Sequence, residues 1–383
     1  MKKILVLLIP FILCGCWNYK ELNQLAIVSG MAIEKENDEY VLTAQIINSQ
    51  KSDVQDSSNI DGNKPVNILK AKGKTVHEAL SNMALISPKD LYIGHNKLFI
   101  IDEEVAKNGI EKIIDFLIRQ PESHKQFQVL ISKGDKASNI LEVLTPIEDL
   151  PAKDILLTLH LASNQKGNVT EVTYDELLSN IHKEGLEPTI PVIEITKSNN
   201  NLKKGTDIKL SGMSVFKRDK LIGYLNYEES LGYNLIRNNI KKDVINFKCN
   251  GNYGSFEIVS ITTNFKVDIV NEKPLVNINT EGSLYLSEMN CDLNISKNSE
   301  RKKLMDIINK KVETIISETI YNVKSKYKVD IFGFGYYLYQ NNYKYWVNNK
   351  NNWDNLFNNI DLKINVNLNI TKKGSILEPA KEG

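Results

Sequence analysis

A short apolar run near the start of the 383-residue chain limits what the rest of the protein can become. The run covers residues 4–13, follows the positively charged pair Lys2 and Lys3, and ends in the letters CGCW. About ten apolar residues cannot span a bilayer, because a transmembrane helix needs about 20. A charged start before a short apolar run is typical of a secretory signal peptide. We therefore expect the remaining chain to fold outside the cytoplasm.

Residues 13–16 (LCGC) indicate how this signal is removed. They resemble the bacterial lipobox, in which an aliphatic, a variable and a small residue precede an invariant cysteine. The motif implies that residues 1–15 are a lipoprotein signal peptide, that cleavage follows Gly15, and that the Cys16 thiol carries a diacylglyceryl group. Two acyl chains anchor a protein stably, since each buried CH₂ contributes ~0.8 kcal/mol. A metal site at this cysteine pair would need further ligands nearby, and the next cysteine is Cys249.

The composition is that of an ordinary globular protein, with 42% hydrophobic and 25% charged residues. Loss of Lys2 and Lys3 with the signal takes the formal net charge from +1 to −1, so no global field attracts nucleic acid or anionic lipid. No second apolar stretch of 18 residues follows, and we expect a soluble body tethered at one end. Besides Cys16, the mature chain keeps Cys249 and Cys291, which can form a disulfide or remain as buried thiols.

The first half of the mature chain predicts alternating strands and helices. A hairpin is expected over residues 21–47, with its turn at EKENDE, and a polar loop over 48–65. Pro188 and Pro191 favour an edge strand at 187–196, because proline cannot donate to a β-ladder. Hydrophobic periodicity and breakers predict helices at 75–84, 109–120, 136–144, 151–163 and 173–184, and strands at 90–101 and 126–132.

The stretch KSNNNLKKGTD (197–207) is the most linker-like part of the chain. We therefore predict an N-terminal α/β region at 16–198, with room for two domains, and a C-terminal α/β region at 207–378. The C-terminal region is expected to hold a hairpin at 208–226, a helix at 228–238, and strands at 244–249, 254–270, 275–286 and 361–374.

A long amphipathic helix is predicted at 301–327, and we expect it to pack on the C-terminal sheet. Its apolar stripe consists of Leu304, Ile308, Val312, Ile315, Thr319 and Val323, while lysine and glutamate fill the other face. The predicted fold class is therefore α/β of the mixed α+β kind: a multi-domain protein with mixed sheets flanked by helices.

Three segments of the chain resemble a known family. They are GCWNYKELNQLAIVSGMAI (15–33), LSGMSVFKRDKLIGYLNYEESLGYNL (210–235) and DIFGFGYYLYQNNYKYWVNNKNNWDNLF (330–357). In this order and behind a lipobox, they resemble the Ger(x)C family, the lipoprotein C subunits of bacterial spore germinant receptors. The family's aspartate before IFGFG is Asp330 here. Its usual Trp-Asp pair after the lipidated cysteine is Trp17-Asn18 in this chain, which loses the acid.

The resemblance implies a subunit that is not an enzyme and needs no cofactor. Such proteins assemble with an integral-membrane A subunit and a transporter-like B subunit, and the complex detects nutrients such as amino acids, sugars or nucleosides. We therefore expect this chain on the outer face of the spore inner membrane or cell membrane, held in the lipid bilayer through the acylated Cys16. The family fold implies three α/β domains around mixed sheets.

An extracytoplasmic solute-binding or hydrolytic lipoprotein is the alternative class. It would need clustered carboxylates and exposed aromatic residues that converge on one cleft. The five histidines show no metal-binding or catalytic spacing, and no nucleotide-binding or nucleophile motif follows an expected strand. The sequence therefore predicts no catalytic residue and no metal ligand.

The aromatic residues between Phe332 and Phe357 leave two interpretations open. They can form a packed core under the last strand, or they can form a docking surface, since tryptophan and tyrosine dominate interface energetics. Within this segment, Gly333 and Gly335 are expected to let the backbone approach a neighbouring element closely. The candidate interface residues are Trp17, Tyr336, Tyr343, Trp346 and Trp353.

Overall fold

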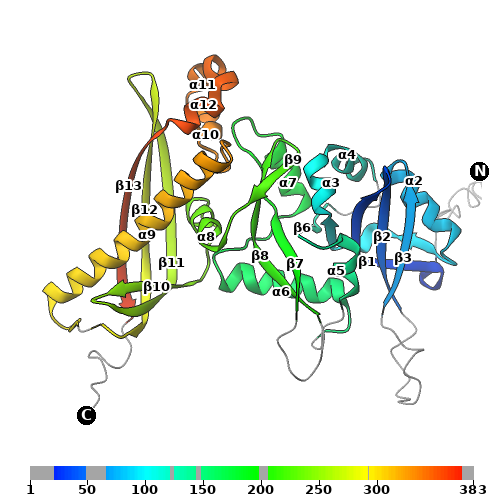
Figure 1. The fold of residues 1–383 in the computed structure, drawn as a ribbon, viewed down its shortest axis with the longest axis horizontal. Helices are drawn as coiled ribbons and strands as arrows, with labels where there is room; N and C mark the ends of the chain where they lie inside the picture. The colour runs from blue at the N-terminus through cyan, green and yellow to red at the C-terminus, as the bar shows by residue number, and fades with distance from the viewer. Residues whose placement is uncertain are drawn as a thin grey trace, which may run out of the picture.

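The structure is a computed structural model that describes residues 21–48, 66–120, 125–143, 148–197, 206–291 and 293–372. Its strands form two β-sheets with helices around them, arranged along one long axis (Figure 1). The N-terminal sheet occupies one end of this axis and the C-terminal sheet the other. The expected signal peptide, Cys16 and most of the polar loop lie outside the described residues.

The N-terminal sheet has nine strands, and the expected hairpin at 21–47 forms two of them. The two-residue turn of this hairpin holds Asn37 and Asp38 at positive φ of 46° and 67°, which is the type I′ geometry that suits a twisted hairpin. The strands lie in the order β3 (Val66–Gly73), β2 (Glu39–Ile47), β1 (Leu25–Glu36), β5 (Leu98–Ile101), β6 (Gln128–Ser132), β7 (Pro191–Lys197), β8 (Thr206–Lys217) and β9 (Lys220–Tyr224), with β4 (Asp90–Tyr92) beside β1.

Two strands of this sheet differ from the sequence-based expectation. The strand predicted at 90–101 is interrupted by η4 (Ile93–His95), so β4 pairs with the start of β1 and β5 with its later residues. The prediction of an edge strand at 187–196 is wrong, because β7 lies between β6 and β8. Pro188 precedes the strand and Pro191 is its first residue, a position where proline is tolerated in a sheet.

Helices pack on both sides of the N-terminal sheet. The expected cap of the first helix is present, since Thr75 Oγ1 accepts from the Glu78 N–H at 3.1 Å. The helix α4 ends at Arg119, two residues before Pro121, in agreement with the end expected for the helix at 109–120. Besides η4, the helical elements of this half are η1 (Leu22–Gln24), α2 (Val76–Asn82), η3 (Met83–Leu85), α3 (Glu103–Asn108), α4 (Glu111–Arg119), α5 (Ala137–Glu142), α6 (Pro151–Gln165) and α7 (Tyr174–Ile181).

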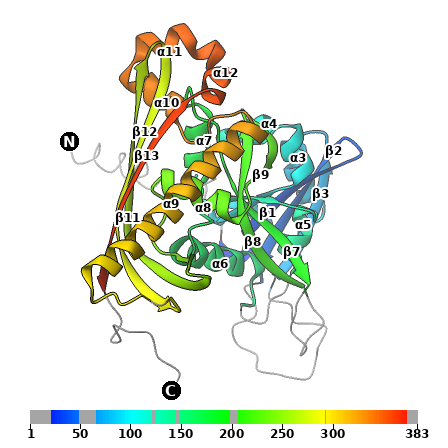
Figure 2. The same ribbon diagram turned by 60° about the vertical axis from the view of Figure 1, so that its left-hand side comes forward.

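The C-terminal sheet has four strands in chain order, β10 (Val244–Cys249), β11 (Asn252–Val270), β12 (Lys273–Met289) and β13 (Asp361–Lys372). The expected long helix is α9 (Asn298–Lys326), which lies along this sheet in Figure 2 and buries all six residues of the predicted stripe. Cys249 and Cys291 are joined as a disulfide, with 5.8 Å between their Cα atoms. This bridge fixes the end of β10 to the chain that leaves β12.

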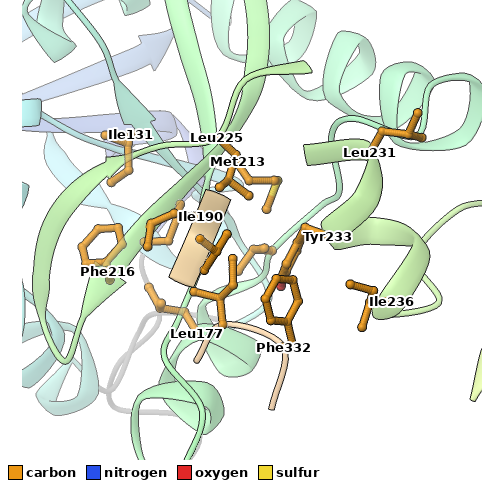
Figure 3. Packing of buried hydrophobic residues seen from close by; sticks show 14 of the residues in the cluster. Ile131, Leu177, Ile190, Met213, Phe216, Leu225, Leu231, Tyr233, Ile236 and Phe332 are labelled. Carbon is orange, nitrogen blue, oxygen red and sulfur yellow. The ribbon is translucent and has the colours of Figure 1, made fainter. Parts of the chain in front are cut away.

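A helix between the two sheets, α8 (Tyr227–Ile236), packs against α9. Gly232 allows this contact, because a Cβ atom there would overlap the Thr319 hydroxyl. The core continues from one sheet to the other. Figure 3 shows Ile190, which precedes β7, and Met213 of β8 packed with Tyr233 of α8 and with Phe332. The mixed α+β fold class is thus confirmed, while the division into regions 16–198 and 207–378 stays a prediction, since β7 and β8 pair across the expected linker.

Candidate functional site

Asp330 is the buried centre of the 330–357 segment, one of the three segments that resemble the family. Only 2% of its surface is exposed, and its carboxylate accepts three backbone N–H groups: from Phe332 at 3.0 Å, Gly333 at 2.8 Å and Gly335 at 2.7 Å. These amides lie at the start of α10 (Phe334–Asn341), where no earlier helical turn supplies carbonyl partners. The Asp330 side chain therefore stabilises the IFGFG turn and the helix that follows.

Burial raises the pKa of Asp330 to about 6. The N–H groups of Gly335, Gly333 and Phe334 and the Trp353 indole act in the opposite direction, because they favour the charged carboxylate. The indole nitrogen of Trp353 donates to Asp330 Oδ2 at 3.2 Å. The carboxyl is almost completely removed from water, and this desolvation outweighs the four favourable contacts.

The glycines of this turn are needed for close packing, as the sequence analysis expected. Gly333 has a φ of 87°, in the left-handed region that side chains rarely adopt. A Cβ atom on Gly335 would lie 2.7 Å from the Trp353 Nε1 atom and 2.8 Å from the Trp346 ring. On the other side, Gly185 lies against the backbone of Gly335, and its carbonyl accepts the Tyr336 N–H at 3.0 Å.

Trp346 and Trp353 are buried, so for these two candidates the structure favours the packed-core interpretation over the docking surface. They are 3% and 5% exposed, and their rings meet edge to face with 5.6 Å between centroids. Trp346 is in α11 (Tyr343–Asn349), and its Nε1 donates to Glu184 at 2.8 Å. Trp353 begins α12 (Trp353–Asn358). The exposed surface of each indole is therefore too small for a partner to use it as an anchor.

The tyrosines of the same segment remain at the surface. Tyr343 is 61% exposed and Tyr339 is 37% exposed, and their rings lie edge to face at 5.7 Å. Tyr336 is half-buried and stacks on Tyr339 at 6.0 Å. These three side chains form a connected aromatic surface, which we call the tyrosine face. Trp17, the fifth predicted interface residue, lies outside the described residues, as does Cys16.

A pocket of about 430 Å³ adjoins Asp330 and joins segments that are far apart in the chain. Its lining includes Glu187, which precedes β7, and Lys217 and Arg218 of the β8–β9 turn. Burial raises the pKa of Glu187 to about 7, although the Arg218 N–H donates to its carboxylate. The Glu187 N–H donates to the Asp330 carbonyl at 2.8 Å. Sequence reasoning missed Glu187, because an isolated glutamate before a proline matches no motif.

The pocket's charged side chains are largely paired with one another. Lys217 contacts Asp354 at 2.8 Å, and Lys350 contacts Glu184 at 3.3 Å.

Within the described ranges, no group of three or more His, Cys, Asp or Glu side chains could hold a metal ion. The same ranges contain no helix with the length and apolar character that a membrane crossing requires.

Comparison with known families now assigns the class of protein. Residues 18–195 match the family model described as "Spore germination protein N-terminal domain". Residues 211–374 match the model described as "Spore germination B3/ GerAC like, C-terminal". The chain belongs to the Ger(x)C family of spore germination proteins. The two models meet near the stretch that the sequence analysis identified as a linker.

Individual relatives agree with this assignment over most of their length. Spore germination protein KC of Bacillus subtilis (strain 168) is 27% identical over 373 residues, which cover 92% of this chain and 90% of the relative. Spore germination protein B3 of the same organism is 26% identical, with 95% of each chain covered. The crystal structure of the GerBC protein superimposes with a TM-score of 0.58 at 20% identity, covering 93% of this chain and all of that one. This structure shares the fold.

Proposed function

We propose that this chain is the C subunit of a nutrient germinant receptor, anchored by lipid to the outer face of the spore inner membrane and assembled there with A and B membrane subunits. The observation that carries the proposal is that spore germination family models match both halves of the chain, directly behind a lipobox. Relatives of nearly the same length carry the name spore germination protein.

The anchor is the diacylglyceryl group on Cys16. Two acyl chains hold a protein on a bilayer far more firmly than one. Four residues separate Cys16 from Glu21, the first described residue, and the five residue steps between the two reach at most about 18 Å when fully extended. The folded body therefore stays close to the membrane, where a partner in the same plane has a high effective concentration.

The body acts by assembly rather than by binding the germinant. A binding site for a small polar nutrient needs polar groups that are free to turn toward it. In the pocket next to Asp330, the Trp346 and Trp353 indoles and the Lys217 and Lys350 ammonium groups already contact carboxylates of this chain. This pairing also disfavours the alternative of a solute-binding or hydrolytic lipoprotein at this pocket.

The tyrosine face is the proposed contact for a partner subunit. Tyrosine is enriched at interfaces because its ring supplies a large contact area and its hydroxyl supplies a polar handle. Tyr343 is the most exposed of the three rings. Trp17 is a second candidate, because it follows the lipidated cysteine directly and must lie near any membrane partner.

The proposal is tested in spores that express a tagged copy of the chain in place of the native gene. We expect the tagged chain to copurify from detergent extracts with two membrane proteins, the A and B subunits, and its deletion to abolish the response to one class of nutrient. Normal germination with every nutrient, together with recovery of the chain alone, would contradict the assignment. Calorimetry of the purified chain with those nutrients is expected to show no binding tighter than millimolar.

A further inference from the structure

The loop that follows α2 exposes two large apolar side chains side by side. Leu85 is 83% exposed and Ile86 is 51% exposed, whereas Met83, which begins η3, is fully buried and fixes the loop to the core. A single exposed leucine is ordinary on a protein surface. Here the whole stretch 83–88 (MALISP) contains no charged residue, so the two exposed side chains belong to an uncharged segment. We call residues 83–88 the apolar loop.

The apolar loop lies beside the point where the described chain begins. It leads directly into β4, which pairs with the first residues of β1, Leu25 with Asp90 and Ile27 with Tyr92. A pocket of about 770 Å³ is lined both by Gln24, just before β1, and by Ala84 and Ser87 of the loop. In Figure 1, α2, which leads into the loop, lies at the same end of the long axis as β1, the first strand of the described chain.

The chain outside the described residues connects this end to the membrane. This step rests on the proposed lipidation of Cys16, which places a bilayer surface within about 18 Å of Glu21. The apolar loop is therefore among the parts of the body nearest to the lipid. Lys89 and the partly exposed Tyr92 follow it. Lysine and tyrosine suit the interface between acyl chains and headgroups, because each has an apolar stem and a polar end.

We propose that the apolar loop inserts Leu85 and Ile86 into the outer leaflet of the bilayer. The occupant of this surface is lipid, and the contact is a second membrane attachment beside the acyl anchor. Two attachments restrict the rotation of the body on its tether. The long axis then points away from the membrane, and α9 with the C-terminal sheet β10–β13, at the opposite end of this axis from α2, lies farthest from the lipid (Figure 1).

The test uses the full processed and acylated chain, reconstituted in vesicles of phosphatidylcholine and phosphatidylglycerol. Cys249 and Cys291 form a disulfide and Cys16 is acylated, so an Ile86→Cys chain offers one thiol for a nitrobenzoxadiazole label. We expect its emission to shift to the blue and to be largely lost when the lipids carry brominated acyl chains. The matched control is Tyr321→Cys, at a site on α9 that is 69% exposed. Its label should show neither change.

Flotation of the same vesicles separates the two proposals. A chain that floats while its label at position 86 behaves like the label at 321 would overturn the membrane contact and leave the anchor intact. A chain that does not float contradicts the lipid anchor and, with it, this inference. Adding Leu85→Glu to the Ile86→Cys chain should abolish quenching without releasing the protein from the vesicles. A label at 86 that is shielded only when A and B subunits are present would identify a protein occupant and overturn the lipid contact.

Discussion

The indole of Trp353 donates to the carboxylate of Asp330 at 3.2 Å, and the same oxygen accepts the Gly335 N–H at 2.7 Å. One buried acid thus connects α12, α10 and the IFGFG turn. Leaving a buried donor unpaired costs about 1–3 kcal/mol, so this carboxylate stabilises several groups at once. The relationship explains why an aspartate, two glycines and a tryptophan occur together in the 330–357 segment: each fits only in the presence of the others.

Replacement of Asp330 by Ala should destabilise the fold strongly. The substitution leaves three backbone N–H groups and the Trp353 indole without their acceptor, and we expect a loss of at least about 3 kcal/mol in the free energy of unfolding. Urea denaturation of the purified chain measures it. The matched control is Asp354→Asn, which removes only the exposed contact to Lys217 and should cost less than about 1 kcal/mol. Equal losses in the two variants would contradict the central role of Asp330.

The Glu187→Gln variant should change how stability depends on pH. Burial raises the folded-state pKa of Glu187 to about 7, above the value of about 4.3 in an unfolded chain. The native state therefore binds the proton more tightly, and stability is gained as pH falls from about 7 towards 4. Glutamine removes this titration while it can still accept the Arg218 N–H. We expect the variant to be more stable than the native chain at pH 8, by on the order of 2 kcal/mol, with the difference shrinking by pH 5 and vanishing near pH 4.

Denaturation curves at pH 8, 7, 6 and 5 decide this prediction. Asp330, whose pKa burial raises to about 6, acts in the same direction over a slightly lower range, so the native chain keeps part of its pH dependence when Glu187 is replaced. Curves for the native and variant chains that run parallel across this range would show that Glu187 does not titrate between pH 5 and 8.

A charged residue on the face of α9 that packs against the C-terminal sheet should unfold the C-terminal half. Ile308 is fully buried in the stripe that faces the sheet, and Ile308→Asp places an unpaired charge there at a cost of several kcal/mol. Tyr321, on the same helix but 69% exposed, is the matched position, and Tyr321→Asp should leave the melting temperature nearly unchanged. Scanning calorimetry compares the two. A normal melting temperature for Ile308→Asp would mean that the stripe is not buried.

Most of the helices and strands could be predicted from patterns among residues close together in the sequence. The features that could not be predicted depend on contacts between segments that are far apart in the chain. The α9 stripe follows from a spacing within one helix, so every one of its six predicted residues is buried. The position of β7 inside the sheet depends on β6 and β8 as neighbours, which the two prolines do not reveal. Burial of Trp346 likewise depends on Glu184 and Gly185, more than a hundred residues earlier in the chain. Aromatic density alone does not distinguish a core from a docking surface.

Membrane attachment should depend on Cys16 alone among the N-terminal cysteines. Cys16→Ala removes the thiol to which we assign the diacylglyceryl group, so the chain should no longer incorporate labelled fatty acid and should leave the membrane fraction. Cys14→Ala is the matched control, because position 14 is variable in the lipobox and is discarded with the signal peptide. It should change neither result. Continued labelling of the Cys16→Ala chain would show that the acylated residue has been assigned wrongly.

Substitutions in the 330–357 segment should separate an effect on partner docking from an effect on folding. The tyrosine face is exposed, whereas Trp346 and Trp353 are buried. Tyr343 is 61% exposed, and Tyr343→Ala should leave the melting temperature within about 1 °C of the native value, since exposed substitutions away from special features cost little. The same variant should copurify less with the A and B membrane subunits. Trp346→Ala, by contrast, removes a buried ring and its contact to Glu184, and should cost about 3–5 kcal/mol in folding stability.

The comparison of Tyr343→Ala with Trp346→Ala therefore distinguishes a docking residue from a core residue in one segment. Val347, which is 43% exposed on the same helix α11, supplies the control for position: Val347→Ala removes less contact area than the tyrosine change and should reduce copurification less. Copurification that is unaffected by Tyr343→Ala, and by the double change with Tyr339→Ala, would exclude the tyrosine face as the partner contact. Trp17 would then be the remaining candidate, because it directly follows Cys16, the proposed lipidated residue, in the sequence.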